Sequence, residues 1–416
     1  MCKITKENDS LQRQTENKDE DSQKIQGNKN IPELRFPEFE GEWKEVQIKD
    51  IANIVGGGTP STKNKDFWNG KINWFTPTEV GENKYLFNSE RKITEKGLEK
   101  SSATLLPINT ILLTTRATIG RRSIILKKST TNQGFQSLTI KNNSNVEFIY
   151  YLLDTLKKIL LRKSCGSTFL ELSKKELKKI NIIIPIIEEQ EKIANFLSAI
   201  DKKIGFMEKT NKNYQRVLKY YIHKLLEIGD KEHNQLIQIK DCIIESKEKN
   251  LNGLNLPIIS STLDGIFLQS DYFDNDSVAI DVTKYKIIPR NYFTYRSMSD
   301  TGIFKFNIQN LYERALVSSA YPVFKVKSEI NSDYFKYYLN YSNMMKKQLY
   351  INKEGGTRYA LSISKFKKMN IILPSSKVQT KISNVINSLN KKYEINNKKL
   401  HYLKQFKKGL LQKMFC

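Results

Sequence analysis

The sequence predicts an α+β protein: two mixed α/β domains separated by two long helices, which pair as an intramolecular antiparallel coiled coil with pseudo-twofold symmetry. Three observations predict this fold: an internal repeat, two segments with the 3.5-residue apolar spacing of a coiled coil, and many short strand-like runs between turn residues. A chain of 416 residues, 39% of them hydrophobic, is long enough for two or three domains.

The internal repeat holds one register over a long segment. Residues 177–185 read LKKINIIIP and residues 366–374 read FKKMNIILP, so Pro374 lies 189 residues after Pro185. The same distance separates further identical pairs, which are Gly166 and Gly355, Thr168 and Thr357, Ser173 and Ser362, Gln190 and Gln379, Ile193 and Ile382, and Asn195 and Asn384. The domains also open alike, because residues 46–51 (VQIKDI) resemble residues 237–242 (IQIKDC). Chance similarity of Lys-rich helices does not explain so long a register.

Each copy of the repeat ends in a long segment whose apolar residues alternate between spacings of three and four. This is the pattern of a coiled-coil seam. The first seam contains Ile193, Leu197, Ile200, Ile204, Met207, Tyr214, Leu218, Tyr221 and Leu225, and the second contains Ile382, Ile386, Leu389, Tyr393, Leu400, Leu403, Leu410 and Met414. Residues 193–225 would span about 50 Å as a helix, more than one turn of DNA.

One asparagine interrupts each seam, Asn211 in the first and Asn396 in the second. They coincide only if the helices run antiparallel with Asn211 opposite Asn396, and Tyr214 then faces Tyr393. Two buried amides that satisfy each other would fix the register of the pair. A parallel homodimer, which sets each asparagine against its own copy, is the competing arrangement.

These observations divide the chain into five parts. We expect a disordered polar tail over residues 1–30, a first domain over 31–187, a first coiled-coil helix over 188–229, a second domain over 230–376 and a second helix over 377–416. The longest apolar run, residues 180–187, is too short to span a membrane. The four cysteines are far apart and form no CxxC pair, which indicates neither zinc nor disulfides and fits a reducing cytoplasm.

The chain is strongly basic, with 69 Lys and Arg against 44 Asp and Glu and a formal charge of +25. This excess favours a polyanionic partner, which could be DNA, RNA or an acidic membrane surface. An A/T-rich, Lys-rich code is the alternative explanation of the charge.

Both domains place basic and amide side chains beside turn residues. Residues 56–60 (GGGTP) could hold a phosphate through backbone N–H groups or could be only a tight connection. Arg, Asn and Gln are the side chains that bond base edges in pairs, although phosphate contacts and solvated surface roles are the alternatives. The candidate DNA-binding residues are Gly57, Gly58, Ser61, Arg116, Arg121, Arg122, Asn132, Gln133, Gln136, Arg290, Tyr295, Arg296, Ser297, Arg314, Tyr321 and Arg358.

Catalytic motifs are missing from the sequence. It has no GxxxxGK[ST] phosphate loop and no Asn-Pro-Pro-Tyr or Asp-Pro-Pro-Tyr, the motif of an amino-methyltransferase that flips its base. The histidines His223, His233 and His401 are scattered, and no clustered carboxylates indicate a nuclease metal site. A binding protein is therefore favoured over an enzyme.

The order of these motifs resembles the specificity subunits of type I restriction–modification enzymes, from Pro32 to the C-terminus. In the first half the resemblance rests on residues 57–61 (GGTPS), 74–77 (WFTP), 94–98 (TEKGL), 118–120 (TIG), 132–135 (NQGF), 166–168 (GST) and 185–201. In the second half it rests on residues 257–260 (PIIS), 285–286 (YK), 293–297 (FTYRS) and 319–324 (SAYPVF).

The resemblance implies two target-recognition domains, each reading one half of a split, asymmetric double-stranded DNA site. The helices would measure the unread spacer and dock two modification (methyltransferase) subunits, and two restriction (motor–nuclease) subunits would complete the assembly. This chain would carry no cofactor, since S-adenosylmethionine, ATP and Mg²⁺ would belong to the partners.

The second copy departs from the first at three places: Asn390 replaces Asp201, Val378 replaces Glu189, and the turn around Gly302 lacks the Thr-Ile-Gly form. If Asp201 or Glu189 serves partner docking, the two docking faces differ. Two other functions compete with this interpretation, a stand-alone DNA-modifying enzyme and a basic coiled-coil adaptor that binds RNA or acidic surfaces.

Overall fold

The computed structural model describes residues 30–165, 170–231, 235–272, 281–356 and 358–416. The chain forms two compact units, of which the first comprises residues 1–206 with 400–416 and the second comprises residues 207–399. The predicted tail lies outside the described residues apart from Asn30, as do the repeat positions Gly166, Thr168 and Thr357.

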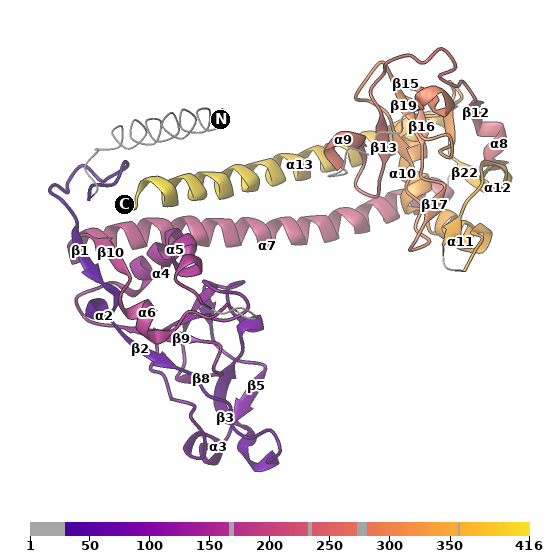
Figure 1. Cartoon of the computed structure of the whole chain (residues 1–416). Helices are drawn as coiled ribbons and strands as arrows, with labels where there is room; N and C mark the ends of the chain where they lie inside the picture. The colour runs from indigo at the N-terminus through magenta and orange to yellow at the C-terminus, as the bar shows by residue number, and fades with distance from the viewer. Residues whose placement is uncertain (1–29, 166–169, 232–234, 273–280, 357) are drawn as a thin grey trace, which may run out of the picture. The chain divides into compact units, whose positions relative to one another are not determined.

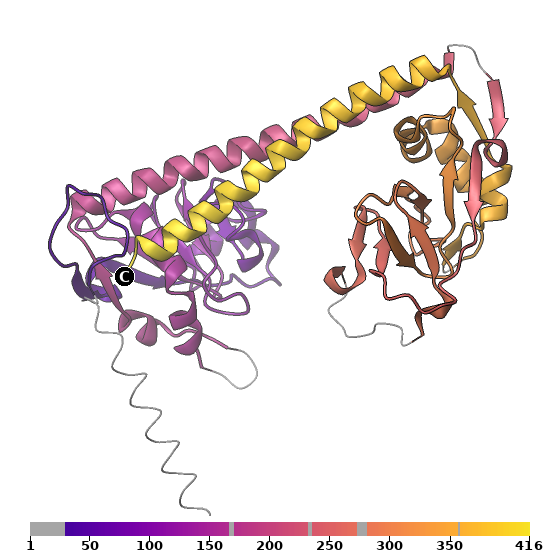
Figure 2. The same ribbon diagram turned by 90° about the horizontal axis from the view of Figure 1, so that it is seen from above.

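Two long helices contribute to both units, α7 (Ile187–Lys231) and α13 (Ser376–Lys413). In the first unit, Leu197 near the start of α7 shares a buried cluster with Leu410 near the end of α13. In the second unit, Leu218 of α7 shares a cluster with Ile386 of α13. Within each unit the two helices therefore pack antiparallel, side by side in both views (Figure 1, Figure 2).

The first domain is built on two larger sheets. A five-stranded sheet has the order β2-β9-β6-β7-β4, and a three-stranded sheet has the order β5-β3-β8. The strands are β2 (Ala52–Gly56), β3 (Trp68–Phe75), β4 (Tyr85–Leu86), β5 (Arg91–Ile93), β6 (Ile111–Leu113), β7 (Arg122–Ile125), β8 (Ser129–Thr131) and β9 (Gln136–Ile140). The helices are α2 (Ile48–Ile51), α3 (Glu95–Glu99), α4 (Val146–Thr155), α5 (Lys157–Arg162) and α6 (Lys174–Lys178). Ile111, Ile124 and Leu138 of the larger sheet share one buried core with Phe148 and Leu152 of α4.

The second domain is built on a four-stranded sheet of order β12-β20-β16-β18, with the short pairs β13-β14, β15-β19 and β17-β21 beside it. The strands are β12 (Ile243–Ser246), β13 (Ile259–Ser261), β14 (Ile266–Leu268), β15 (Lys286–Pro289), β16 (Phe293–Thr294), β17 (Met298–Ser299), β18 (Asn307–Ile308), β19 (Arg314–Val317), β20 (Val323–Val326) and β21 (Tyr359–Ala360). The helices are α8 (Ile239–Cys242), α9 (Gln269–Tyr272), α10 (Ser332–Tyr341), α11 (Asn343–Asn352) and α12 (Ile363–Lys368). Phe293 packs against both Phe324 and Phe335 in its core.

The sequence repeat is also a structural repeat. In the first unit, β1 (Lys44–Gln47) pairs antiparallel with β10 (Asn181–Ile184) directly before α7. In the second unit, β11 (Gln235–Gln238) pairs in the same way with β22 (Asn370–Leu373) directly before α13. The predicted fold class of two mixed α/β domains with two long antiparallel helices is confirmed.

A repeated glutamine ties each domain to its long helix. Gln190 of α7 donates to the Pro185 carbonyl at 2.9 Å and accepts from the backbone N–H of Asn145 at 2.9 Å. Gln379 of α13 donates to the Pro374 carbonyl at 2.9 Å and accepts from the N–H of Asn331 at 2.9 Å. Each of these asparagines is the N-cap residue of a domain helix, α4 or α10. The buried amide therefore fixes that helix on the coiled coil, as backbone groups away from water require partners.

Candidate nucleic-acid interface

Two loops of the first domain meet at an exposed junction. Thr59 Oγ1 donates to Oε1 of Gln133 at 2.6 Å, and Asn132 Oδ1 accepts from the N–H of Gly134 at 2.9 Å. Ser61 is exposed two residues after Thr59. The predicted positions Ser61, Asn132 and Gln133 are thus brought to one place, although they are far apart in the sequence.

The glycines of this junction serve packing. A Cβ on Gly57 would lie 1.9 Å from the Asn132 carbonyl oxygen, and one on Gly58 would lie 2.3 Å from the carbonyl carbon of Ser102. The N–H of Gly58 already donates to the Thr131 carbonyl at 2.9 Å. Gly58 is buried and its N–H is already bonded, which favours a packing role over a DNA contact. Gly57 and Gly58 therefore form a tight connection, which was the alternative to a phosphate-binding loop.

Another polar candidate of this domain, Gln136, lies on the strand next to the junction. Gln136 opens β9 and pairs in register with Gly56, the residue before the glycines. Its Oε1 is buried and has no hydrogen-bond partner among the residues that the structure describes.

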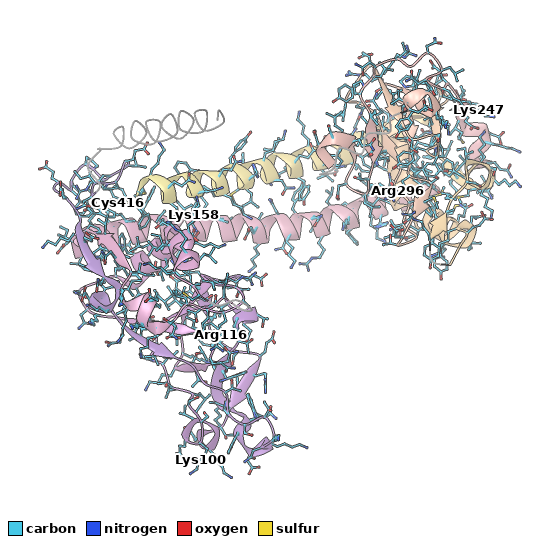
Figure 3. All side chains as sticks on the ribbon, in the orientation of Figure 1. Lys100, Arg116, Lys158, Lys247, Arg296 and Cys416 are labelled. Atoms are coloured by element: carbon cyan, nitrogen blue, oxygen red, sulfur yellow. The ribbon has the colours of Figure 1, made fainter. Side chains whose placement is uncertain are left out.

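The three predicted arginines of the first domain have different surroundings (Arg116 is labelled in Figure 3). Arg116 forms a half-exposed ion pair with Glu171 at 2.9 Å. Arg121 is exposed and has no ion pair within the described chain. Arg122 is directed inward, where it pairs with Asp154 of α4 at 2.9 Å and its side chain is only 11% exposed. In the structure Arg122 links β7 to α4, which favours a structural role over a DNA contact.

The second domain contains a cleft of about 520 Å³. Its walls include the predicted residues Arg296 and Tyr321, together with Tyr285. Arg296, labelled in Figure 3, is exposed. Tyr321 is half-buried, and burial raises the pKa of its phenol, so it enters the cleft as a neutral donor and acceptor. The cleft joins two of the predicted residues in one concave site.

The other predicted arginines of this domain lie in exposed ion pairs outside the lining of the cleft. The pairs are Arg290 with Glu313 at 3.1 Å, Arg314 with Glu248 at 2.7 Å and Arg358 with Asp300 at 2.8 Å. Of these six side chains only Asp300 belongs to the cleft wall. Exposed pairs of this kind are worth little to stability, so the arginines remain available for phosphate contacts.

Tyr295 is a core residue. Its side chain is 0% exposed, its ring packs against Phe306 and Phe366, and its hydroxyl donates to the Leu361 carbonyl at 3.2 Å. It is wrong as a DNA contact because the aromatic run around it forms the interior of the domain. Ser297 is half-buried, and its carbonyl accepts from the N–H of Leu361 at 2.9 Å.

Sequence reasoning missed Asp264 and Lys305, which also line the cleft. The Asp264-Gly265 dipeptide was recognisable as a turn, and Gly265 has a φ of +138°. The turn signal does not say what the hairpin tip faces, because the opposite wall comes from residues 296–305 of another segment.

Two segments of the chain, residues 40–214 and 227–405, match the family model described as type I restriction modification DNA specificity domain. The chain belongs to this family. It is 29% identical over 409 residues to the type I restriction enzyme MjaIX specificity subunit of Methanocaldococcus jannaschii, covering 90% of this chain and 92% of that protein. It is 33% identical over 175 residues to the EcoR124I/EcoR124II specificity subunit of Escherichia coli, covering 40% and 43% of the two chains.

A solved structure shows the same fold. The S subunit of a type I restriction-modification system from M. genitalium superposes with a TM-score of 0.57 at 15% identity, covering 93% of this chain and 99% of that one. The family model and the relatives confirm the predicted family, and this structure confirms the fold. This chain is the DNA specificity subunit of a type I restriction–modification system, a non-catalytic member of its complex.

The predicted register of the specificity subunit's helices is corrected by one residue at the asparagines. Tyr214 stacks on Tyr393 with ring centroids 6.2 Å apart, as the antiparallel register requires. Asn211, however, donates to Oδ1 of Asn397 at 2.9 Å rather than to Asn396. Asn396 and Asn397 are both half-buried, so either asparagine could occupy the position of the helix–helix interface that faces Asn211.

Glu189 and Asp201, which differ from their counterparts in the second copy of the repeat, both make contacts within the specificity subunit. The Glu189 side chain is 1% exposed and binds Arg35 through both oxygens, at 2.8 and 2.7 Å. It also accepts from the indole of Trp43 at 3.3 Å. Asp201 is paired with Lys407. Glu189 therefore holds the segment before β1 on α7, a contact that Val378 does not repeat.

Within the described residues, the specificity subunit has no group of three or more His, Cys, Asp or Glu side chains that could hold a metal ion. In the same part of the chain, no helix is long and apolar enough to cross a membrane.

Proposed function

We propose that this specificity subunit reads a split and asymmetric DNA site, with one target-recognition domain for each half. The first domain would comprise residues 31–187 and the second residues 230–376, while the helices at 188–229 and 377–416 hold them and measure the spacer. The proposal rests on one observation: the same scaffold presents different side chains at equivalent loop positions.

The equivalence follows from a shared hydrogen bond and a shared turn. The N–H of Leu172 donates to the Thr115 carbonyl at 3.0 Å, and the N–H of Leu361 donates to the Ser297 carbonyl at 2.9 Å. Thr115 and Ser297 are thus equivalent.

Five residues after each of them stands a glycine with positive φ, +88° at Gly120 and +74° at Gly302. Between these fixed points the first domain has Arg116 where the second has Met298, and after the glycine it has Arg121 where the second has Ile303. Guanidinium groups donate to base edges or phosphates and apolar side chains do not, so the halves favour different sequences.

The remaining candidates divide between the two half-sites. Ser61, Arg116, Arg121, Asn132, Gln133 and Gln136 would serve the first, and Arg290, Arg296, Ser297, Arg314, Tyr321 and Arg358 the second. In the cytoplasm the subunit would assemble with two modification and two restriction subunits, which would use S-adenosylmethionine, ATP and Mg²⁺.

Mapping methylated bases across the genome, with and without this gene, tests the proposal. The expected result is a two-part motif, with different halves and a fixed spacer, that disappears with the gene. A contiguous or palindromic motif would contradict it. The purified chain should bind DNA with a strong dependence on salt and show no methyl transfer or cleavage alone. Cleavage by the isolated chain would overturn the proposal.

A further inference from the structure

The cleft of the second domain has a nearly balanced set of charges. Its lining carries two cations, Arg296 and Lys305, and two anions, Asp264 and Asp300. The chain as a whole has a formal charge of +25. Surfaces that follow the phosphate backbone are basic, because their affinity comes from neutralising phosphates. Asp300 is paired with Arg358 at 2.8 Å, so Asp264 is the cleft carboxylate that suits a donor on the edge of a base.

The hairpin between β13 and β14 holds Asp264 in a fixed position on one wall. Asn307, which is buried, donates from Nδ2 to Ser261 Oγ and to the Thr262 carbonyl, both at 2.9 Å. Across the tip, the N–H of Thr262 donates to the Gly265 carbonyl at 2.8 Å, and Thr262 Oγ1 accepts from the N–H of Asp264 at 3.1 Å. The tip is therefore built by hydrogen bonds at its base and across its turn.

The carboxylate at this tip belongs to Asp264. Asp264 is exposed, and within the described residues its side chain has no hydrogen bond or ion pair. A surface carboxylate repels phosphates. Lys305 in the same cleft attracts the Asp264 carboxylate without a direct ion pair, so its oxygens can still accept from a donor on the DNA. The exocyclic amino groups of cytosine and adenine are the donors that the major groove offers.

Arg296 differs from the other arginines of its domain. Arg290, Arg314 and Arg358 each pair with a carboxylate, whereas Arg296 is exposed with no ion pair in the described part of the chain. Its guanidinium lies beside Tyr321 on the cleft wall. A guanidinium that no carboxylate occupies can donate to O6 and N7 of guanine together.

We propose that Asp264 and Arg296 are specificity-determining residues of the second half-site, where Asp264 accepts from the amino group of a cytosine or adenine and Arg296 donates to a guanine. Asn307 is a positioning residue, since it holds the hairpin that carries Asp264. This inference rests on the proposed function of a split DNA site.

The first test maps methylated bases in cells that express the complete system with Asp264→Asn or Arg296→Gln. Both side chains are exposed, so the substitutions do not disturb the core. Each variant should relax the motif at one position, and both positions should lie in the same half. The matched controls are Asp271→Asn and Lys347→Gln, two exposed charged residues outside the cleft lining, which should leave the motif unchanged. An unchanged motif and methylated fraction in both cleft variants would overturn the inference.

The second test measures DNA binding, so it still decides the question if a variant loses methylation altogether. The complex with its modification subunits is titrated with duplexes in which 7-deazaguanine, which lacks N7, replaces each guanine of the second half. One replacement should weaken binding of the wild-type complex about tenfold or more, as a lost base-edge pair implies. The Arg296→Gln complex should be insensitive to that same replacement, and equal sensitivity would contradict the assignment. If the wild type yields no split motif, the proposed function itself fails. A split motif that neither cleft variant changes refutes only this inference.

Discussion

The Nζ atom of Lys407 lies 2.5 Å from Oδ1 of Asp201, which joins α13 to α7 in the first unit by an ion pair. Tyr151 of α4 donates to the other oxygen of the same carboxylate at 2.6 Å. The repeat places Asn390 and Leu218 at the equivalent positions of the second unit. Both members of the pair have therefore changed together, and the neutral Asn390 donates to Tyr337 at 2.9 Å instead.

Reversing one charge of this pair should destabilise the first unit, and reversing both should recover part of the loss. Asp201→Lys sets two ammonium groups against each other, whereas Asp201→Lys with Lys407→Asp restores opposite charges. We expect a coupling energy of about 1 kcal/mol between the substitutions, measured by urea unfolding of the four variants. Lys408→Glu, an exposed neighbour, is the control. Strictly additive effects would show that the pair does not stabilise the helices.

Removing either repeated glutamine should cost about 1–3 kcal/mol, because each amide satisfies two backbone groups that have no other partner when it is lost. Gln190→Ala and Gln379→Ala should have similar effects on unfolding, and their sum should describe the double variant, since they lie in different units. Gln215→Ala on the exposed face of α7 is the control. Losses as small as that of the control would contradict the structural role of the amides.

Replacing Glu189 with valine, the residue at the equivalent position of the second unit, should strongly destabilise the first unit. Glu189→Val leaves the largely buried Arg35 without its carboxylate, a change that typically costs about 3–5 kcal/mol. Glu189→Val with Arg35→Leu removes both charges and should recover part of that loss, as judged by the midpoint of urea unfolding. If the double variant is no more stable than the single one, the pair itself is not the source of the stability.

The first unit should lose stability in acid through Glu147. Burial acts to raise the pKa of this carboxyl, but hydrogen bonds from Ser198, Tyr85 and Lys84 outweigh it, so its pKa lies below the ordinary value. A carboxyl with a depressed pKa in the folded state stabilises the fold above its unfolded pKa of about 4.3. That contribution disappears as pH falls through the folded pKa.

The measurement is unfolding at a series of pH values between about 6 and 3. Glu147→Gln should be less stable than wild type at pH 6, and the difference should shrink below pH 4.3. The exposed Glu191→Gln is the control. A difference that stays constant across this pH range would contradict the assignment.

Local patterns predicted the helical half of this molecule well, since the spacing of apolar residues sets which residues face a partner. The contact between Tyr214 and Tyr393 follows from that spacing. The choice of Asn397 over Asn396 as the partner of Asn211 depends on how two neighbouring polar side chains share one position of the interface. The interior of the domains was harder. Tyr295 follows a strand of two residues, too short for the alternation that separates inward from outward side chains.

Contacts between distant segments could not be predicted from the sequence. Arg35 meets Glu189 across 154 residues, and no spacing rule connects them. The charged residues of the cleft come from two separate segments, residues 259–269 and 296–305, so its balance of charge becomes evident only when both segments are placed. A turn or a single arginine, taken alone, does not say whether it faces solvent, a carboxylate or DNA.

Tyr295→Phe separates a core role from a role in reading DNA. The substitution keeps the ring but removes the hydroxyl that donates to the Leu361 carbonyl, so it should cost about 1 kcal/mol in unfolding. Because the side chain is buried, the methylated motif should stay as in wild type. Tyr321→Phe, on the cleft wall, keeps its ring in the same way and tests whether a cleft hydroxyl affects the motif. A motif altered by Tyr295→Phe at the position that Arg296→Gln changes would show that the buried tyrosine shapes the reading surface directly.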